Sequence, residues 1–505
     1  MNTQRQNPSV VIIGAGMTGI GLAIKLKLAG INNITLLEKA GSVGGTWREN
    51  TYPGVACDVP SHAYTYSFAP NPDWSSFFAP GHEICAYFQS VFDRYALAEH
   101  TYFNEEVTRC HYERGRWQVE TANDKHFEAD FLFSATGFLH RPKYPEIPGL
   151  ENFAGPKMHS ARWDHSVELK RKKIGVIGTG SSATQIIPEL IDTENTQVSV
   201  FQRTAQWIVH TDNKPYSESD KAKFRAKPSR IERVKNLSLY VFEQGTTALT
   251  SQSLFYRTMH KLFAWNAVRH LKQKVKNPEL RKKLTPDYTF GCKRVVMNGR
   301  FYDAMQKPNA HLVTEKIAKV VPNGIVTADG QHHELDILVM ATGFDSTAFM
   351  RPISLEGRDG ITINDVWRKK MVAYRSMCLP GFPNFFLTLG PNSPVGNYSV
   401  IAISEKQADY AIQLINAWQS GTLETVEVKR SALDSWYAKL KGKLSHTIWA
   451  SGCQSWYLDA DGDPLTWPDS WKAWTHMMKT CNLDDFEHVS VQAQNDTETY
   501  SLAES

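Results

Sequence analysis

Residues 9–19, Ser-Val-Val-Ile-Ile-Gly-Ala-Gly-Met-Thr-Gly, join a short apolar run to a Gly-x-Gly-x-x-Gly turn. A stretch with helical character follows over residues 20–29, and residues 33–38, Asn-Ile-Thr-Leu-Leu-Glu, form a second apolar run that ends on an acid. Strand, glycine turn, helix and strand make one βαβ unit, whose helix N-terminus can receive a pyrophosphate. Glu38 stands 19 residues after Gly19, where a carboxylate accepts hydrogen bonds from a ribose diol. The unit predicts an FAD-type or NAD-type site that includes Gly14, Gly16, Met17, Thr18 and Gly19.

The same pattern returns later in the chain. The apolar run at residues 173–177 leads into Gly-Thr-Gly-Ser-Ser-Ala at 178–183, and a helical stretch and the run at 197–201 follow. Nineteen residues after the last position of this fingerprint stands Gln202, not an acid, and Arg203 comes next. A carboxylate there would repel a 2′-phosphate, whereas a guanidinium can bind it in a forked geometry. The second unit therefore predicts an NADP-type site with Gly178, Gly180, Ser181, Ser182, Ala183, Arg203 and Thr204.

A longer internal repeat indicates how the two units are connected. Residues 130–138 and 336–344 are near copies of each other, 206 positions apart, and each ends in Ala-Thr-Gly-Phe. They flank the second βαβ unit, which predicts two crossings between domains, with one nucleotide domain inserted into the other. Residues 212–290 are rich in Lys and Arg, nearly free of glycine and apolar at helical spacing, so they predict a helical insertion.

Composition and cysteine spacing exclude several classes of protein. The 505 residues are 42% hydrophobic and 21% charged, which indicates a globular chain of three to four domains of about 150 residues each. No apolar run approaches the roughly 18–20 residues of a membrane span, and the N-terminus does not resemble a secretory signal. The seven cysteines are scattered, without a Cys-x-x-Cys pair or zinc spacing. This pattern argues against a disulfide scaffold, a dithiol redox centre and a structural metal, and we expect a soluble, cytoplasmic protein.

The positive charge is concentrated in the expected helical insertion. Residues 212–294 hold 19 Lys and Arg against 7 Asp and Glu, a net of +12, while the whole chain carries +4. The favoured interpretation is a set of solvated helix faces around an anionic cofactor site. Contact with a membrane surface or a nucleic acid has no supporting motif, and no nucleic acid partner is expected.

Three further motifs give the sequence a family resemblance. They are Gly-Gly-Thr-Trp at 44–47, Tyr-Pro-Gly-Val-Ala-Cys-Asp at 52–58, and Phe-Ala-Gly-Pro-Lys-Met-His-Ser-Ala-Arg-Trp-Asp at 153–164. Together with the two glycine fingerprints and the two Ala-Thr-Gly-Phe segments, they resemble the class B flavoprotein monooxygenases. The third motif resembles the signature of the type I Baeyer–Villiger monooxygenases within that class. The resemblance covers nearly the whole chain, to about residue 480.

The resemblance implies an α/β fold with two Rossmann-like dinucleotide-binding domains and a helical insertion. The expected division is an FAD-binding domain at 1–145 and 346–490, an NADP-binding domain at 146–211 and 291–345, a helical insertion at 212–290, and a disordered tail at 491–505.

The resemblance also implies roles for individual residues. Asp58 and Arg294 match the catalytic pair, and Lys293 matches a lysine that helps to hold the NADP phosphate. Further cofactor contacts are expected from Gly45, Thr46, Trp47, Asp58, Asn392 and Trp456. The signature residues are Phe153, Gly155, His159, Trp163 and Asp164, and His159 is expected to couple domain movement without performing chemistry. The residues after Trp456 depart from the glycine-proline pattern of the cyclic-ketone enzymes, which leaves the substrate range open.

The implied activity is an NADPH- and O2-dependent conversion of ketones to esters or lactones through a C4a-peroxyflavin, with sulfoxidation as a side activity. FAD and NADPH are the implied cofactors, a small ketone and O2 the partners, and a monomer or homodimer the assembly, with no metal. A permanent cation suits a reactive peroxide, because arginine cannot lose its proton and act as an acid. A neighbouring carboxylate such as Asp58 can position that guanidinium.

Several alternatives stay open at this point. A flavin-containing N- or S-monooxygenase would share both nucleotide folds, and a non-catalytic flavin-binding protein would share the motifs without using them. A disulfide reductase is excluded by the missing Cys-x-x-Cys pair. Arg294 could be a surface ion-pair partner, Asp58 a turn cap, and His159 and Trp163 packing residues. Cys57 and Cys292 are expected to be small buried fillers and not nucleophiles.

Overall fold

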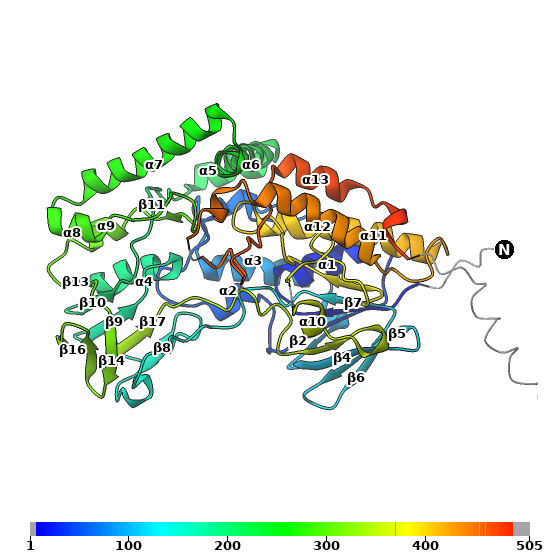
Figure 1. The fold of residues 1–505 in the computed structure, drawn as a ribbon, viewed down its shortest axis with the longest axis horizontal. Helices are drawn as coiled ribbons and strands as arrows, with labels where there is room; N and C mark the ends of the chain where they lie inside the picture. The colour runs from blue at the N-terminus through cyan, green and yellow to red at the C-terminus, as the bar shows by residue number, and fades with distance from the viewer. Residues whose placement is uncertain (1–6, 369, 454, 460, 488–505) are drawn as a thin grey trace, which may run out of the picture.

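The computed structural model describes residues 7–368, 370–453, 455–459 and 461–487, which form an elongated molecule built around two parallel sheets (Figure 1). The first sheet has the strand order β19-β7-β1-β2-β3, and all its neighbours are parallel. Its strands are β1 (Val10–Ile13), β2 (Ile34–Glu38), β3 (Thr101–Phe103), β7 (Phe131–Ser134) and β19 (Phe385–Leu387). The central strands β1 and β7 are buried along their whole length, as continuous apolar runs in a parallel sheet require.

Two layers cover the first sheet. Successive side chains of a strand point to opposite faces, so Val10 and Ile12 pack on the helical side, while Val11 and Ile13 pack against a second, antiparallel sheet. The helices on or near this unit are α1 (Met17–Leu28), α2 (Thr46–Glu49), α3 (Gly81–Arg94), α11 (Val400–Gln419), α12 (Arg430–Leu444) and α13 (Trp471–Lys479). The second layer consists of β4 (Val107–Glu113), β5 (Arg116–Thr121), β6 (His126–Ala129) and β18 (Ser354–Glu356), with α10 (Ile363–Val366) packed on β18.

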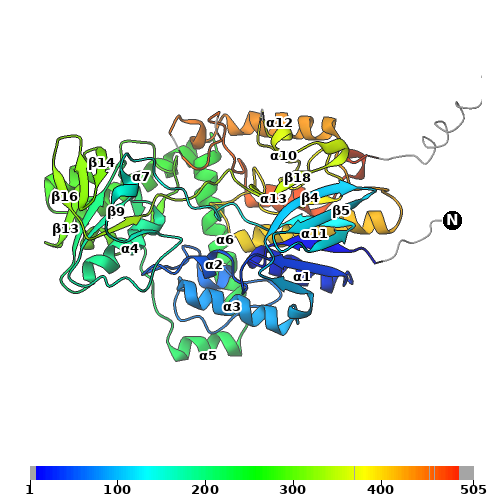
Figure 2. The same cartoon turned by 90° about the horizontal axis from the view of Figure 1, so that it is seen from below.

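The other parallel sheet lies at the opposite end of the molecule, in the order β13-β10-β9-β17-β8 (Figure 2). Its strands are β8 (Lys157–His159), β9 (Lys173–Ile177), β10 (Gln197–Phe201), β13 (Ala310–Val313) and β17 (Ile337–Met340). The helices α4 (Ser181–Asp192) and α9 (Phe301–Ala304) pack together against it, and a small antiparallel sheet covers its other face. That sheet contains β14 (Ile317–Val321), β15 (Gly324–Thr327) and β16 (His332–Glu334). The unit is therefore a second Rossmann-like layer structure.

A group of helices leaves this second unit between β11 (Ile208–Val209) and β12 (Val296–Met297), which pair in parallel. The helices are α5 (Glu218–Ala226), α6 (Ser229–Thr250), α7 (Leu254–Lys274) and α8 (Pro278–Lys283). Side-chain caps fix several of their starts: Ser217 forms a capping box, and Ser253 and Asn277 accept hydrogen bonds from backbone amides of the first turn. In Figure 1, α6 and α7 form the upper rim of the molecule.

The predicted α/β class with two Rossmann-like units and a helical insertion is confirmed. The internal repeat supplies one strand to each sheet, β7 to the first and β17 to the second, and the chain returns to the first sheet with β19. One boundary differs: α1 begins at Met17 and not near Ile20, because the last residues of the glycine fingerprint already form its first turn. The predicted tail at 491–505 lies outside the described residues. Among the described helices, none has the length and apolarity needed to cross a lipid bilayer.

Candidate active site

The first glycine fingerprint forms a tight turn at the carboxyl end of β1. Gly14 has φ +105°, and a Cβ on it would lie 2.7 Å from the carbonyl oxygen of Ala135. Gly16 caps the N-terminus of α1, and a Cβ on Gly45 would lie 2.9 Å from the Cα of Gly16. The Gly-Gly-Thr-Trp motif therefore lies directly against the fingerprint. Backbone without side chains on both sides leaves the approach to the helix N-terminus that a pyrophosphate needs.

Glu38 lies beside this turn at the end of β2, as predicted for the acid that binds a ribose. Its side chain is buried, 4% exposed. One carboxylate oxygen accepts a hydrogen bond from the Ala15 amide at 2.8 Å, and the other accepts from the Ala40 amide at 3.0 Å and from Arg48 at 3.2 Å. These donors hold the carboxylate in place at the switch point of the sheet, where nucleotides bind in open α/β folds.

Other predicted cofactor residues surround the same turn. Trp47 donates its indole N–H to the hydroxyl of Tyr64 at 3.1 Å, and that hydroxyl donates to the sulfur of Met17 at 3.2 Å. Thr46 begins α2, and Thr18 is buried in the first turn of α1. The Gly-Gly-Thr-Trp motif and the fingerprint are therefore one connected structure, although 25 or more residues separate them in sequence.

Asn392 has a buried polar atom that fits a bound cofactor. The residue is 1% exposed, its amide N–H donates to the carbonyl of Leu465 at 2.7 Å, and its side-chain nitrogen donates to the carbonyl of Pro464 at 3.1 Å. Its side-chain oxygen has no hydrogen-bond partner among the described residues. A buried acceptor without a donor is costly, so the site suits a ligand that supplies an N–H or O–H group.

The second glycine fingerprint repeats the geometry of the first at the end of β9. Gly178 has φ +111°, and a Cβ on it would lie 2.5 Å from the carbonyl oxygen of Ala341. Gly180 caps α4 and has open space around its Cα, since a Cβ there would meet no atom within 4 Å. Ser181, Ser182 and Ala183 form the first turn of α4, and Thr204 accepts a hydrogen bond from Thr179 at 3.1 Å. The N-terminus of α4 is therefore open to a phosphate.

Two cations lie close together beside the second fingerprint. Burial lowers the pKa of Lys293, and the charge of Arg203 lowers it further. Among the described residues neither forms an ion pair with a carboxylate; the ammonium of Lys293 lies 4.6 Å from the centre of the Tyr288 ring. Gln202 occupies the position that corresponds to Glu38 in the first unit. Its side chain is buried and donates to the carbonyl of Lys283 at 2.7 Å, so it points away from the nucleotide site. Asp287 acts on Lys293 from nearby and raises its pKa, but the two adjacent cations form no ion pair with it, so they fit a 2′-phosphate.

Asp58 and Arg294, predicted as the catalytic pair, are in direct contact. Nη2 and Nε of Arg294 donate to Oδ2 of Asp58 at 2.5 and 3.2 Å, and Nη1 donates to the carbonyl of Gly396 at 3.2 Å. The two side chains are 27% and 28% exposed. Burial is the largest single influence and lowers the pKa of Arg294, but the charge and hydrogen bond of Asp58, together with Tyr457 and Cys57, outweigh it, so the net shift is upward. The guanidinium is therefore a permanent cation held in one orientation.

The loop that carries Asp58 docks on the first turns of α4, in the other nucleotide unit. Gln185 of α4 accepts a hydrogen bond from the Tyr52 hydroxyl at 2.9 Å and donates to the carbonyl of Ala56 at 3.1 Å. Gly54 has φ +79°, and a Cβ on it would lie 2.8 Å from the Gln185 carbonyl oxygen. Burial raises the pKa of Tyr52 to about 12, so its hydroxyl stays a donor. The motif at 52–58 thus joins the two units, and no motif or spacing in the sequence points to Gln185.

Tyr457 lies near Arg294, and the ring of Trp456 lies 4.3 Å from the ring of Tyr457. The Trp456 ring lies 6.0 Å from the Phe138 ring at an interplanar angle of 23°, and its carbonyl accepts a hydrogen bond from Ser346 at 3.2 Å. Tyr457 is buried, and burial raises the pKa of its hydroxyl, against the opposing effect of the Arg294 charge. A Cβ on Gly396 would lie 2.6 Å from that hydroxyl. Tyr457, which no sequence motif singles out, therefore closes one side of the Arg294 site.

A disulfide joins Cys292 to Cys453, with 6.3 Å between their Cα atoms. Cys292 is buried, as expected, but it is a disulfide partner and not merely a small filler, and the argument against a disulfide scaffold does not extend to this pair. The two cysteines are 161 residues apart, and such a separation carries no local sequence signal. Cys57 is a buried free thiol whose pKa is raised by burial, which suits a filler. The disulfide ties the segment of Arg294 to the segment that precedes Trp456.

The signature residues lie where the chain enters the second unit. Phe153 is buried in the core between the second sheet and β14–β16, and a Cβ on Gly155 would overlap the carbonyl oxygen of Asp336. His159, at the end of β8, is 1% exposed and packs between the rings of Tyr144 and Phe344, at 5.3 and 5.9 Å.

The imidazole of His159 accepts a hydrogen bond at Nδ1 from the Ala161 amide at 3.1 Å, and burial lowers its pKa below the usual value. Trp163 packs in the core around α4, and Asp164 accepts a hydrogen bond from the Ser166 amide at 2.9 Å. His159 thus contacts Tyr144 and Phe344, which lie on the two segments where the chain crosses between the units, and it does not contact the Asp58–Arg294 pair.

Comparison with known proteins agrees with this geometry. Residues 11–239 match the family of pyridine nucleotide-disulphide oxidoreductases. The chain is 44% identical over 461 residues to an uncharacterized monooxygenase of Mycobacterium tuberculosis, covering 91% of this chain and 92% of the relative. It is 37% identical over 483 residues to a Baeyer-Villiger monooxygenase of Streptomyces coelicolor, covering 95% and 92%. The crystal structure of OTEMO in complex with FAD and NADP superposes with a TM-score of 0.86 at 29% identity, covering 95% of this chain and 99% of that chain.

These matches separate the families that share two dinucleotide folds. A disulfide reductase needs a redox-active Cys-x-x-Cys pair, which this sequence lacks. The relatives that match over more than nine-tenths of the chain are monooxygenases, and the Asp58–Arg294 pair and the signature at 153–164 are in place. The chain belongs to the Baeyer–Villiger monooxygenase family of flavoproteins.

Proposed function

We propose that this protein uses FAD, NADPH and O2 to convert ketones into esters or lactones. The observation that carries the proposal is the Asp58–Arg294 pair, because it is assembled from both nucleotide units at the place where they meet. A protein that only bound the two nucleotides would have no use for a half-buried, oriented guanidinium at their junction.

The two glycine turns divide the cofactors between them. FAD fits the first turn, where Gly16, Gly45 and Glu38 leave room for a pyrophosphate and a ribose and Asn392 offers an unpartnered acceptor. NADPH fits the second turn, where Arg203 and Lys293 can bind the 2′-phosphate. On this assignment residues 1–145 and 346–490 make the FAD domain, and residues 146–211 and 291–345 make the NADP domain.

Bound FAD, reduced by NADPH, supplies the electrons with which O2 is activated for transfer of one oxygen atom. The chain itself supplies charge and position. Arg294 holds a positive charge where oxygen chemistry develops negative charge, and at an effective dielectric of about 20 a pair of charges about 4 Å apart is worth ~4 kcal/mol. Asp58 and the Gly396 carbonyl fix the direction of the guanidinium, and Tyr457 covers it. Preorganised charge of this kind needs no rearrangement during the reaction.

The assembly and the compartment follow from the same proposal. All residues of the site come from one chain, which supports a catalytically complete monomer, whether or not two copies associate. Dependence on NADPH supports a cytoplasmic location, because the cell interior supplies this reductant. The Cys292–Cys453 disulfide would there be exposed to thiol reductants.

The test is oxygen-coupled NADPH oxidation with a panel of linear, aryl and cyclic ketones, with products identified by mass spectrometry under ¹⁸O2. We expect an ester or lactone that carries one labelled oxygen atom for at least one ketone. Sulfides and amines belong in the same panel, because sulfoxidation is expected only as a side activity. Oxygenation of amines or sulfides without any ester from the ketones would instead identify an N- or S-monooxygenase.

A further inference from the structure

The helices α6 and α7 expose an unusual number of large apolar side chains. Leu254 is 81% exposed and Phe255 68%, and Leu262 and Trp265 are each 56% exposed. All four lie on α7. Leu262 follows Leu254 by eight residues and Trp265 follows Leu262 by three, and this spacing places these three side chains on one face of the helix. The exposed large apolar residues of α6 are Leu237, Tyr240 and Val241, which share one face at i, i+3 and i+4. We call these seven residues and the cations between them the α6–α7 face.

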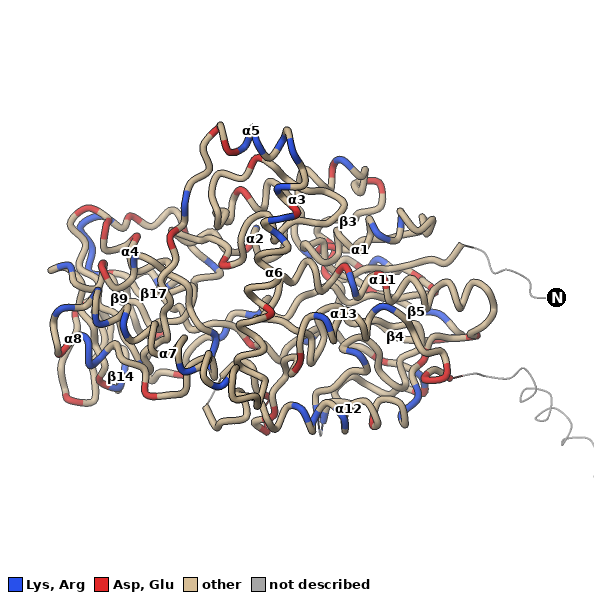
Figure 3. The backbone as a smooth tube through the Cα atoms, turned by 90° about the horizontal axis from the view of Figure 1, so that it is seen from above, with Lys and Arg blue, Asp and Glu red and all other residues tan. Residues whose placement is uncertain are grey.

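The charges on this face are almost all positive. Helix α7 contains Arg257, Lys261, Arg269, Lys272 and Lys274 and no Asp or Glu. Lys274 forms an ion pair with Asp303, but none of the other four pairs with a carboxylate among the described residues. Figure 3 shows the corresponding cations along α7 and α8. Because none of these four pairs with a carboxylate in the part of the chain that the structure describes, they make a cationic strip along the exposed side of the helix.

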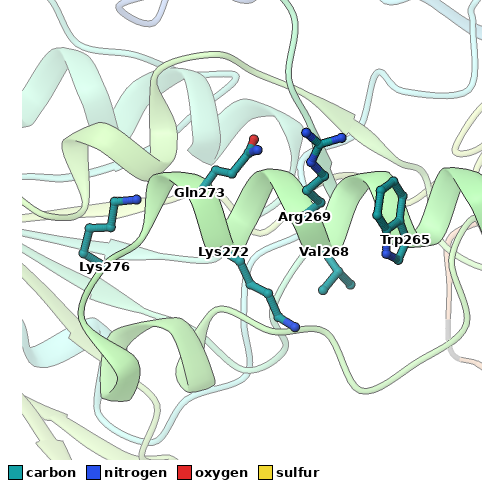
Figure 4. A pocket seen from close by; sticks show the side chains of 6 residues that line it. All are labelled: Trp265, Val268, Arg269, Lys272, Gln273 and Lys276. Atoms are coloured by element: carbon teal, nitrogen blue, oxygen red, sulfur yellow. The ribbon is translucent and has the colours of Figure 1, made fainter.

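Cations and apolar side chains alternate on α7 instead of forming separate patches. The guanidinium of Arg269 lies 5.5 Å from the centre of the Trp265 ring. Trp265, Arg269 and Lys272 occupy successive turns and line a shallow hollow of about 310 Å³ that extends to Lys276 (Figure 4). The acids of α6 do not offset this charge: Glu243 is half-buried and accepts a hydrogen bond from Tyr398 at 2.6 Å, which leaves Glu232 as the exposed one.

Neither a solvated helix nor a second copy of the chain accounts for this face. Solvation explains lysines and arginines, but it does not favour seven exposed large apolar side chains on two adjacent helices. A symmetric contact between two copies would place the same unpaired cations opposite each other, where like charges repel. A partner that complements the face must offer negative charge at its surface and apolar depth beneath it.

We propose that the α6–α7 face is a peripheral docking surface for anionic lipid bilayers. Leucine, phenylalanine and tryptophan enter the boundary between headgroups and acyl chains, while lysine and arginine reach the lipid phosphates along their flexible stems. The face lies on the outer rim of the molecule, on the helical insertion and not on either sheet (Figure 1). Docking there would leave both glycine turns uncovered.

The test is flotation of the flavin-loaded protein with vesicles. One set contains phosphatidylcholine alone, and the other contains phosphatidylcholine with about 30% phosphatidylglycerol. We expect the protein to float with the anionic vesicles, at least about 10-fold more than with the neutral ones, and to be released largely by salt. Equal flotation with both sets, or no flotation with either, overturns the proposal.

Paired variants separate the two contributions. Phe255→Ser with Trp265→Ser should lower anionic-vesicle binding at least about 10-fold, and Arg269→Glu with Lys272→Glu should abolish it. Matched controls are Leu28→Ser, at an exposed apolar residue of α1, and Arg114→Glu, at an exposed arginine in the turn between β4 and β5; both should float like the parent. The flavin spectrum and NADPH oxidation should be unchanged in every variant, which shows that the fold is intact.

Light scattering of the same proteins tests whether a second copy of the chain, and not a membrane, binds the α6–α7 face. If the parent is a dimer without vesicles and the Phe255→Ser, Trp265→Ser variant is a monomer, the face is an interface between copies and the proposal fails. If the assembly is the same in both and only vesicle binding is lost, the membrane assignment holds.

Discussion

At the scale of single residues, Arg294 has the most direct role in the proposed oxygen transfer. Arg294→Ala removes a fixed cation but no part of either glycine turn, so FAD should stay bound. NADPH oxidation should continue at a reduced rate, because hydride transfer depends more on orientation than on this charge. Ester formation should fall by about 10²–10³-fold, the range seen when one preorganised electrostatic donor is removed, and hydrogen peroxide should appear instead.

The lysine variant at the same position is the control. Arg294→Lys keeps the charge but loses the planar fork that contacts Asp58 twice, so partial recovery is the most it should give. Product yield per NADPH and peroxide release together decide the result. Parental ester yields from the alanine variant would remove Arg294 from the mechanism.

Arg203 and Lys293 set the choice of nicotinamide cofactor. Arg203→Ala should raise the KM for NADPH by about 10- to 100-fold, since it removes a charge-assisted contact to the 2′-phosphate, and should leave the KM for NADH nearly unchanged. The pKa of Lys293 should rise in this variant, because the neighbouring charge of Arg203 lowers it. Equal KM values for NADPH and NADH in the parent protein would contradict this prediction.

Gln185 and Tyr457 could not be predicted from the sequence, and the physical reason is the same for both. The roles of Glu38, Gly16 and Arg203 are set by local spacing along a βαβ unit, and spacing is visible in a sequence. Gln185 and Tyr457 act only because the tertiary fold brings them to Tyr52 and Arg294 from 133 and 163 positions away. No periodicity or motif in the sequence predicts such a long-range contact.

At the scale of elements, the two glycine turns make reciprocal predictions. Gly16→Val places a branched side chain at the N-terminus of α1 beside Gly45, where the FAD pyrophosphate must approach the backbone. The purified variant should be strongly depleted in flavin. Gly180→Val makes the same change at α4, where the space is open, so it should retain flavin and lose NADPH affinity.

Absorbance spectra and nucleotide titrations of the two variants are each other's control. Loss of flavin from both proteins would indicate general damage to the fold. Normal flavin occupancy in Gly16→Val would place FAD elsewhere.

The disulfide is an element-scale constraint, because it fixes the segment before Trp456 to the segment of Arg294. Cys453→Ser should lower the stability by about 2–4 kcal/mol, as the loss of a long-loop cross-link does. It should also raise the share of NADPH that ends as hydrogen peroxide, since Trp456 and Tyr457 would cover the site less firmly. Thermal unfolding and peroxide yield measure the two effects. Cys481→Ser, at a half-buried free thiol, is the control and should change neither.

At the scale of the whole molecule, catalysis depends on how the two units sit against each other. Asp58 comes from a loop that follows the first unit's βαβ core, and Arg294 lies next to β12 in the second, so neither unit alone contains the pair. The loop at 52–58 and helix α4 join them through Gln185, and the crossing segments join them around His159.

His159→Gln tests the importance of that junction. The ring is buried between the crossing segments and its pKa is lowered, so it is a neutral group that contacts neither reacting partner. We expect kcat to fall while FAD stays bound and the KM for NADPH changes little. A role in packing alone would instead lower the melting temperature and release flavin, with the kcat of the surviving holoenzyme unchanged.

The two Rossmann-like units and the helical insertion followed from a few segments of the sequence, whereas the antiparallel layers β4–β6 with β18 and β14–β16 were not predicted. The two glycine fingerprints, the repeat at 130–138 and 336–344, and the cationic stretch at 212–290 predicted two Rossmann-like units and a helical insertion, and all three are present. The apolar character of the α6–α7 face could not be read in advance. Leu262 and Phe263 look equally suited to a core in the sequence, and only the fold determines that the first is exposed and the second half-buried.

The disulfide also closes the chain into a covalent ring that runs from Cys292 to Cys453 and passes through both units, since β13 and β17 belong to the second sheet and β19 to the first. A single protease cut anywhere inside the ring therefore leaves the two fragments attached. On a gel run without reductant the nicked protein migrates as one band, and with reductant it separates into two. If free thiols are alkylated at lysis, the fraction of nicked protein that separates only with reductant reports how much of the protein was oxidised in the cell that made it.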